Sequence, residues 1–365
     1  MNRIVVTCST LSNITFVPTV ILAFYQSNMK DRFYESYITL HNMFPNADII
    51  GCSSESNIYN ESPHLDIDGE NESIFVCVDI SKDAYSLKTI SSETDQSIDI
   101  DPTVEWNALL LASSSFTNID NILDALRSKI GQNALFGGIA SVEDAESEIG
   151  DVFINGIFHD DSIIVWLIDQ DKYILEGTTL HHFQPVGFEM EVTEAKGSTI
   201  YEIEGQPALK IVEEIIGEIT QEGITSFDHP FFLKHSLDKN FTEAPLCSIK
   251  SIDREKYYID MYRNITNGDK VKVGISLNQK EQKDQSTVFK KYAKKYAVGF
   301  MFNCVGIKGN LGSMEALYLM YIKRNLHIPF AGFHTFGEIG SVNESSASIL
   351  HNQTISMAIL SEKKI

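Results

Sequence analysis

Residues Phe330 to Ile359 read FAGFHTFGEIGSVNESSASILHNQTISMAI, a glycine-punctuated loop followed by two runs that are typical of β-strands. A β-rich run and a segment with helical periodicity precede this stretch. The same order of strand, helix, glycine and hairpin occurs twice more in the chain, and one glycine marks the matching place in each copy: Gly51, Gly137 and Gly332. A solenoid or propeller would repeat faster and more evenly, so we predict a repeated α/β unit of roughly 60 residues.

The helix of each unit carries one apolar stripe. In the first copy Phe33, Tyr37 and Leu40 share a helical face behind Asp31, a suitable N-cap. A crossover helix requires the two strands that it joins to be parallel, whereas a hairpin requires antiparallel neighbours. We therefore predict an α/β protein made of mixed sheets packed with helices. In the second copy the hairpin is expected to pair residues 152–158 with residues 163–168.

Length and composition indicate two domains. A chain of 365 residues is long enough to bury two cores. Proline and glycine in the segment Leu180 to Gly187 are typical of a crossing between domains, and we place the boundary near Met190. The predicted domains are residues 1–190 and 191–365.

Charge and cysteine usage exclude some functions. The formal net charge of -21 disfavours binding to nucleic acid or to an anionic membrane, because both need clustered Lys and Arg. The sequence has neither a secretory signal nor a run near the roughly 20 apolar residues that span a bilayer. The five cysteines are scattered and form no C-x-x-C motif, which indicates reduced thiols. We therefore expect a soluble, cytoplasmic protein.

Blocks of sequence along nearly the whole chain resemble the signatures of FIST proteins, in the same order and with suitable gaps. The blocks are IGCSSESNI (50–58), FGGI (136–139), VFING (152–156), VTEAKGSTI (192–200), EGQPA (204–208), FNCVG (302–306), GFHTFGEIG (332–340) and HNQT (351–354). They cover both the N-terminal and the C-terminal FIST regions. Two places depart from the family pattern: Ile307 stands where Arg is common, and Glu55-Ser56-Asn57 replaces an Ala-Gly-Glu type sequence.

The resemblance implies an intracellular sensory module that binds small ligands, with amino acids proposed, and that is often coupled to histidine kinases or cyclic-dinucleotide enzymes. Some similar members are haem-binding nitric-oxide sensors. No kinase or cyclase segment is fused in this sequence, so the resemblance implies a signal to a separate partner protein. The predicted function is a sensor for an amino acid or a similar small molecule. The alternatives are a haem-based nitric-oxide sensor, a thiol-dependent enzyme and an interaction scaffold.

Candidate ligand-binding residues lie where the predicted inner strands end, because open α/β sheets bind ligands beyond the carboxyl ends of their strands. These residues are Cys52, Ser53, Ser54, Gly137, Gly138, Cys304, Gly306, Gly332, Phe333, Gly337, Glu338, His351 and Asn352. The glycines either let backbone approach a ligand or simply form tight turns. The glycine loop after Cys304 lacks a G-K-[ST] ending, so nucleotide triphosphate binding is not predicted.

The chemistry of these residues leaves alternatives open. Glu338 either receives a ligand ammonium group or accepts backbone N–H bonds that hold its loop. Cys52 and Cys304 are either thiol nucleophiles or small buried side chains, and neither has a motif-linked histidine, so we predict no catalytic residues. The ten histidines form no H-E-x-x-H motif, and we predict no metal site. A single imidazole could still hold haem iron, although a hydrogen-bonded structural role is the simpler interpretation.

Overall fold

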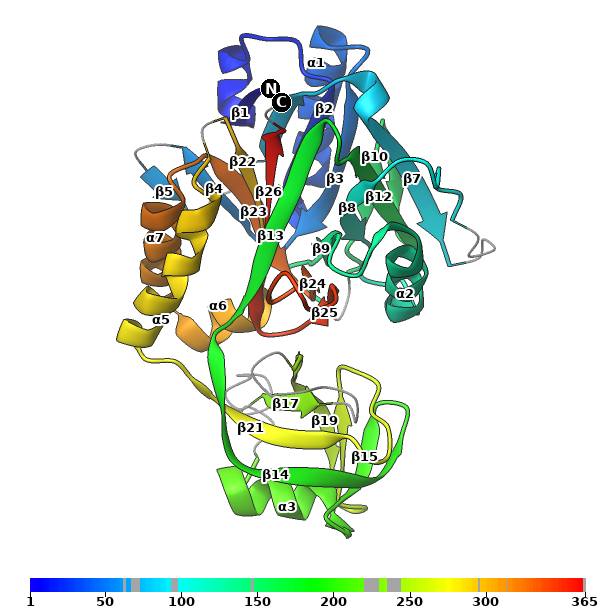
Figure 1. Cartoon of the computed structure of the whole chain (residues 1–365), viewed down its shortest axis with the longest axis vertical. Helices are drawn as coiled ribbons and strands as arrows, with labels where there is room; N and C mark the ends of the chain where they lie inside the picture. Colours follow the sequence, from blue (N-terminus) through cyan, green and yellow to red (C-terminus); the bar gives the residue numbers. More distant parts are fainter. Residues whose placement is uncertain are drawn as a thin grey trace.

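The computed structural model describes the chain except for residues 62–63, 67–72, 93–97, 146–147, 220–229, 235–243, 295, 313 and 364–365. Three sheets form a large body, and a fourth sheet forms a smaller lobe below it in Figure 1. The N-terminal ammonium of Met1 forms an ion pair of 2.8 Å with Glu362, the last residue of β26, at the end of the body away from the lobe (Figure 1). The α/β class and the presence of two domains are confirmed.

The three sheets of the body contain six strands each, and their strands follow the same pattern. The first sheet has the order β1 (Asn2–Thr7), β6 (Ile74–Asp79), β2 (Val20–Gln26), β3 (Asp48–Ser54), β10 (Val152–Ile154) and β11 (Ile157–His159). The second has the order β7 (Tyr85–Ser91), β12 (Ser162–Asp169), β8 (Trp106–Ala112), β9 (Leu135–Ile139), β24 (Glu338–Gly340) and β25 (Ile349–His351). The third has the order β13 (Tyr173–His181), β26 (Thr354–Glu362), β22 (Val298–Cys304), β23 (Phe330–Thr335), β4 (Asn57–Glu61) and β5 (His64–Asp66).

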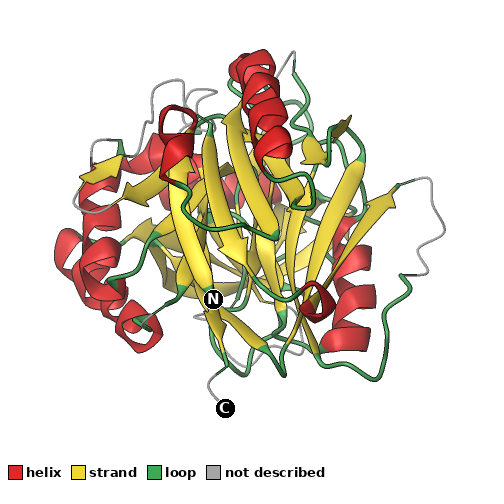
Figure 2. Ribbon diagram, turned by 90° about the horizontal axis from the view of Figure 1, so that it is seen from above, coloured by secondary structure: helices red, strands yellow, loops and turns green. Residues whose placement is uncertain are grey.

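Each of the three sheets of the body has one parallel strand pair that a crossover helix joins, as the sequence predicted. These helices are α1 (Lys30–Met43), α2 (Ile119–Ile130) and α7 (Met314–Leu326). Figure 2 shows the strands gathered in the middle of the body and the helices around its outside. Within the described ranges, no helix is both long and apolar enough to cross a membrane.

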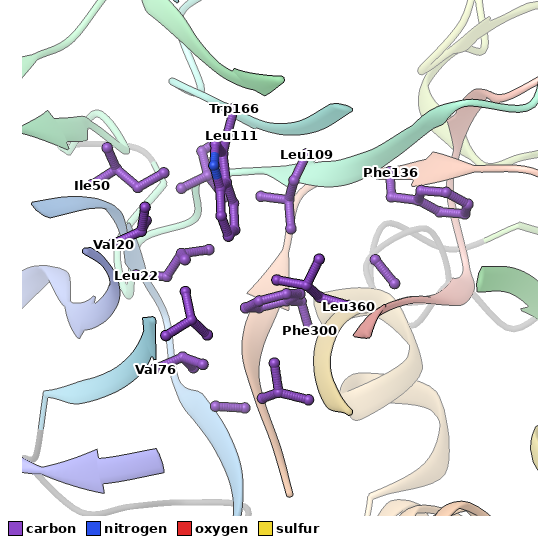
Figure 3. Packing of buried hydrophobic residues seen from close by; sticks show 14 of the residues in the cluster. Val20, Leu22, Ile50, Val76, Leu109, Leu111, Phe136, Trp166, Phe300 and Leu360 are labelled. Carbon is purple, nitrogen blue, oxygen red and sulfur yellow. The ribbon is translucent and has the colours of Figure 1, made fainter. Parts of the chain in front are cut away.

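The inner faces of the three sheets meet in one hydrophobic core (Figure 3). Leu22 of β2, Leu109 of β8 and Phe300 of β22 contribute to it, and all three are fully buried. The ring of Trp166 lies edge-on to that of Phe300, with 6.0 Å between the ring centroids. The outer faces of the same strands pack under the helices, so these strands are buried on both sides. Burial on both sides explains why β2 and β8 read as continuous apolar runs rather than as alternating ones.

The hairpins pair differently from the prediction. Residues 163–168 do not pair with residues 152–158, because β12 pairs with β7 and β8. Instead β10 pairs with β11 across Asn155 and Gly156, whose φ values of +46° and +97° are those of a tight hairpin turn. The β10–β11 hairpin joins β3, the β24–β25 hairpin joins β9, and the β4–β5 hairpin joins β23. Each hairpin thus extends the sheet of another unit, and a self-contained strand-helix-strand-hairpin unit is not confirmed.

The three marker glycines occupy matching positions in β3, β9 and β23. Their partners in the preceding parallel strand are Ala23, Leu110 and Met301. A Cβ atom on Gly51, Gly137 or Gly332 would lie 2.2, 2.0 or 1.7 Å, respectively, from the carbonyl oxygen of that partner. These glycines therefore allow two buried backbones to approach closely, and they lie within strands rather than at bends.

The lobe is one continuous segment between β13 and α5 (Gln279–Gln285). Its long strand β14 (Phe183–Lys196) continues β13 out of the body, as Figure 1 shows. Met190 lies within β14, and strands from both sides of this residue share the second and third sheets of the body. Helix α3 (Ala208–Ile216) packs on the lobe sheet. The other lobe strands are β15 (Thr199–Ile203), β16 (Gln206–Pro207), β17 (Phe231–Lys234), β18 (Leu246–Cys247), β19 (Ile249–Asp253), β20 (Tyr258–Met261) and β21 (Lys270–Ser276).

Candidate functional site

The body and the lobe meet at a neck around the end of β13. Arg263 of the lobe donates a hydrogen bond through Nη1 to the backbone oxygen of Leu350 in β25. The side-chain Nε2 of Gln353 donates to Ser248 Oγ of the lobe at 3.3 Å. His181 ends β13, and its ring lies 5.6 Å from the ring of His351, measured between centroids. We call His181, His182, His351 and Gln353 the neck cluster.

The neck cluster concentrates buried polar atoms that have no hydrogen-bond partner among the described residues. Both ring nitrogens of His181 and of His182, Nδ1 of His351 and Oε1 of Gln353 are in this state. The four residues are at most 6% exposed. A buried polar atom without a partner costs on the order of 1–3 kcal/mol, and native proteins avoid such atoms unless water or a ligand supplies the missing bond. This concentration makes the neck the best candidate for a binding site.

Burial keeps the three imidazoles of the neck uncharged at neutral pH. It lowers the pKa of His181 and of His182 to about 4, and it lowers the pKa of His351 well below its usual value. A neutral imidazole offers one donor and one acceptor. In the part of the chain that the structure describes, no three His, Cys, Asp or Glu side chains lie close enough together to hold a metal ion. The neck is thus suited to hydrogen bonding.

Glu338 and Cys304 lie beside the neck cluster. The Glu338 carboxylate accepts bonds from the hydroxyl of Thr335 and from Thr354, whose Oγ1 and N lie 2.8 and 3.2 Å from its Oε2. Burial raises the pKa of Glu338 to about 8, although these hydrogen bonds act in the opposite direction. These hydrogen bonds tie the turn between β23 and β24 to β26. They are the kind of contact expected if Glu338 holds its own loop. Binding of a ligand ammonium group by Glu338 stays a prediction.

Six of the thirteen predicted site residues lie near the neck. Gly306 faces Gln353, because a Cβ atom at Gly306 would lie 2.7 Å from Gln353 Nε2. Asn352 Nδ2 donates to the backbone oxygen of Phe336 at 3.5 Å, in the loop that leads to Glu338. The six residues are Cys304, Gly306, Gly337, Glu338, His351 and Asn352. That these six residues contact a ligand stays a prediction.

The other seven predicted residues lie in strands of the body, and two of them adjoin β24, because Gly138 pairs with Glu338 and Gly137 with Ile339. Ser53 Oγ accepts a bond from the backbone N–H of Asp151 at 3.0 Å and donates to the oxygen of Ser141. Phe333 stacks on Phe24 in the central core, with 5.2 Å between ring centroids. The remaining residues lie in strands of the body: Cys52 and Ser54 in β3, Gly137 and Gly138 in β9, and Gly332 in β23. The structure therefore does not bring the thirteen residues together in one place.

Sequence reasoning did not select His181, His182, Gln353 or Arg263. A signal existed for two of them, because the His181-His182 pair lies within the predicted crossing between domains, Leu180 to Gly187. Gln353 has a φ of +58°, which a sequence pattern does not reveal. Arg263 lies far from the quoted family blocks and reaches the neck only through the folding of the lobe.

Two cavities are lined by described residues away from the neck. One of about 550 Å³ is bordered by Lys30, Asp31, Tyr34, Gly156 and Phe158. Another of about 370 Å³ lies between Trp106 and the segment Asp99 to Pro102. None of the thirteen predicted residues, and no histidine, borders either cavity.

The buried cysteines are expected to be unreactive in the native protein. Burial raises the pKa of Cys77 and Cys247 to about 12 and also raises the pKa of Cys52 and Cys304. Because the thiolate is the reactive form, only the partly exposed Cys8 is expected to react promptly with a disulfide reagent at pH 8. All five thiols should react in denaturant. Rapid reaction of two or more thiols in the native protein would contradict this expectation.

Comparison with known protein families assigns both halves of the chain. A model of the FIST N domain matches residues 19–206, and a model of the FIST C domain matches residues 208–341. A search of curated proteins finds no match. FIST domains are associated with sensory signal transduction and with the binding of small ligands. With both domain models matched in order, the chain is a member of the FIST family.

Proposed function

We propose that this FIST protein senses a small molecule that binds at the neck and reports the binding through contact with a separate protein. The observation that carries the proposal is the set of unpartnered nitrogen and oxygen atoms on the buried side chains of the neck cluster. A ligand with both donors and acceptors would satisfy these atoms and remove the cost of leaving them unpaired.

The chemistry of the neck suits an amino acid. A neutral imidazole N–H can donate to a carboxylate, and the Arg263 guanidinium adds a positive charge near His351. The acceptor nitrogens of the imidazoles and Oε1 of Gln353 can receive the N–H groups of an ammonium. A zwitterion of a few ångströms therefore matches the available groups better than a purely apolar or a purely anionic molecule does.

The position of the neck suits signalling. A ligand held by residues from both β13 and β25, next to Gln353 and Ser248, would link the body with the lobe. Such a link would favour one arrangement of the two domains, and a partner that contacts both would detect the change. A histidine kinase or a cyclic-dinucleotide enzyme is the proposed partner. The buried thiols, with their raised pKa values, favour binding over thiol catalysis at this site.

Haem is the weaker candidate ligand. All three neck histidines have unpartnered ring nitrogens that could ligate iron. Their rings are already packed against other rings, however: His181 lies 5.6 Å from Phe232, and His182 lies 5.7 Å from Tyr318, between centroids. A porphyrin would have to displace these rings.

Thermal unfolding of the purified chain with each common amino acid, and separately with haemin, tests the proposal. A ligand at about 100 times its Kd should stabilise the protein by about 2.7 kcal/mol, which is a readily measured rise in Tm. The variant His351→Phe should lose this response because it lacks the unpartnered nitrogen. The matched control is His41→Phe, on the exposed side of α1, and it should respond like the wild type.

The proposal fails if no amino acid raises Tm, or if His351→Phe responds as strongly as the wild type. A visible absorption band with haemin that disappears when His181 is replaced would instead favour the haem sensor.

A further inference from the structure

A row of hydrogen-bonded side chains crosses the body between the first and third units, away from the neck cluster. Ser56 Oγ lies 2.7 Å from Nδ1 of His334, and Nε2 of His334 lies 2.7 Å from Oε1 of Glu315. Ser56 follows β3, His334 belongs to β23, and Glu315 opens α7. The three residues are 4%, 0% and 3% exposed, respectively. Serine, histidine and carboxylate in this order form the arrangement that activates a hydroxyl nucleophile.

The partners of Glu315 determine which nitrogen of His334 carries the proton. Asn303 Nδ2 also donates to Oε1 of Glu315, so this oxygen acts as an acceptor. His334 therefore donates through Nε2, and its Nδ1 is left with a lone pair 2.7 Å from Ser56 Oγ, closer than the 3.3 Å that separates it from the backbone oxygen of Ser56. The backbone N–H of His334 also donates to the oxygen of Ser56 at 3.0 Å, which holds the serine against the ring. The Ser56 hydroxyl also lies 3.0 Å from Oε2 of Glu55, so its one proton has two acceptors within reach, and His334 Nδ1 at 2.7 Å is the nearer of them.

A positive charge lies on the other side of the serine. Lys308 Nζ lies 2.9 Å from Ser56 Oγ and 3.0 Å from Oε1 of Glu55. The side chains of Lys308 and Glu55 are 31% and 28% exposed, whereas Ser56 is 4% exposed. Partly exposed ion pairs contribute little to stability and open readily. A lysine ammonium at this place can also stabilise the negative charge that develops on the carbonyl oxygen of an acyl group when the serine attacks its carbon.

We propose that Ser56 is an acyl-accepting nucleophile, with His334 as its general base and Glu315 as the residue that positions His334. The substrate class is a small activated carboxylic ester. The Ser56 Oγ forms a bond to the acyl carbon while its proton passes to His334 Nδ1. The ester C–O bond then breaks, and the leaving alcohol takes that proton. A water molecule then forms a bond to the acyl carbon while one of its protons passes to His334 Nδ1. The bond between the acyl carbon and Ser56 Oγ breaks, Ser56 Oγ takes that proton, and the carboxylic acid leaves. This activity goes beyond ligand sensing at the neck and does not depend on it.

The full-length chain treated with a fluorophosphonate probe, followed by intact mass measurement and peptide mapping, tests this proposal. The wild type should carry one adduct, on Ser56, and should hydrolyse 4-nitrophenyl acetate. Ser56→Ala should abolish both signals, and His334→Gln should slow labelling by about 100-fold or more. Glu315→Gln should slow labelling and change its pH profile, because an amide can donate to Nε2 and reverse the tautomer of His334. Ser36→Ala is the matched control, since Ser36 is also buried but bonds only to a backbone oxygen of its own helix.

The proposal is overturned if Ser56 carries no adduct in conditions under which a known serine hydrolase is labelled. Labelling of His334→Gln at the wild-type rate overturns it as well. Each variant is first compared with the wild type by thermal unfolding. If Ser56→Ala does not fold, the shape-conserving Ser56→Cys takes its place: its thiol should react with iodoacetamide faster when His334 is present than when it is Gln.

Discussion

Replacing Gly332 with alanine is expected to destabilise the protein by more than about 4 kcal/mol, or to prevent it from folding. The new Cβ atom would lie 1.7 Å from the carbonyl oxygen of Met301, an atom of a neighbouring backbone that cannot move aside alone. Both strands are buried on both faces, so a shift would disturb the central core and the layer under α7. Urea unfolding measures the effect. Gly51→Ala and Gly137→Ala should behave similarly, because the same close approach occurs there.

Gly309→Ala is the matched control for this series. Gly309 lies in α6 (Val305–Leu311), and a Cβ atom there would meet no atom within 4 Å. Alanine has the higher helix propensity, by about 1 kcal/mol, so this variant should be as stable as the wild type or slightly more stable. The explanation is wrong if Gly332→Ala and Gly309→Ala unfold at the same urea concentration.

The buried carboxyl of Glu338 is expected to make the protein less stable as the pH rises from about 4.5 to about 8. Its pKa is about 8 in the folded protein, against 4.5 for an ordinary Glu, chiefly because burial disfavours the charged form. The folded state therefore holds this proton more tightly than the unfolded state does. The stabilising contribution is complete below the unfolded pKa and is lost as the pH rises through the folded pKa. Over this window the loss in the free energy of unfolding is on the order of 5 kcal/mol.

The neck histidines change the stability of the protein with pH in the opposite direction to Glu338 over part of the same pH range. Because burial lowers the pKa of His181 and His182 to about 4, their contribution is lost as the pH falls from about 6.5 toward 4. The Glu338 effect is therefore measured as a difference between the wild type and Glu338→Gln, by urea unfolding at each pH. This variant should lose the decline between pH 6.5 and 8. The surface variant Glu218→Gln is the control, and equal pH profiles for all three proteins would refute the assignment to Glu338.

Local sequence patterns determined the helices and the long strands. The spacing of Phe33, Tyr37 and Leu40 predicted α1, and the apolar runs predicted the paired inner strands, because both signals depend only on residues close in the chain. The predicted matching of Gly51, Gly137 and Gly332 also corresponds to three equivalent places in the structure. The prediction missed the turn at Asn155-Gly156, although this dipeptide between apolar residues is a strong hairpin signal.

The sequence by itself determined the crossover helices and the long inner strands, the α/β class and the FIST signatures. The tertiary structure alone decided which sheet each hairpin joins and which polar side chains meet. Short strands such as β10 and β24 carry too few residues to specify a partner, so their pairing depends on the strand edges that the folded body offers. Contacts such as Ser56 with His334 join residues 278 positions apart, and the neck cluster depends on how β13 leads into the lobe. Periodicity reports on neighbours a few residues away, whereas these sites form only when distant segments are buried together.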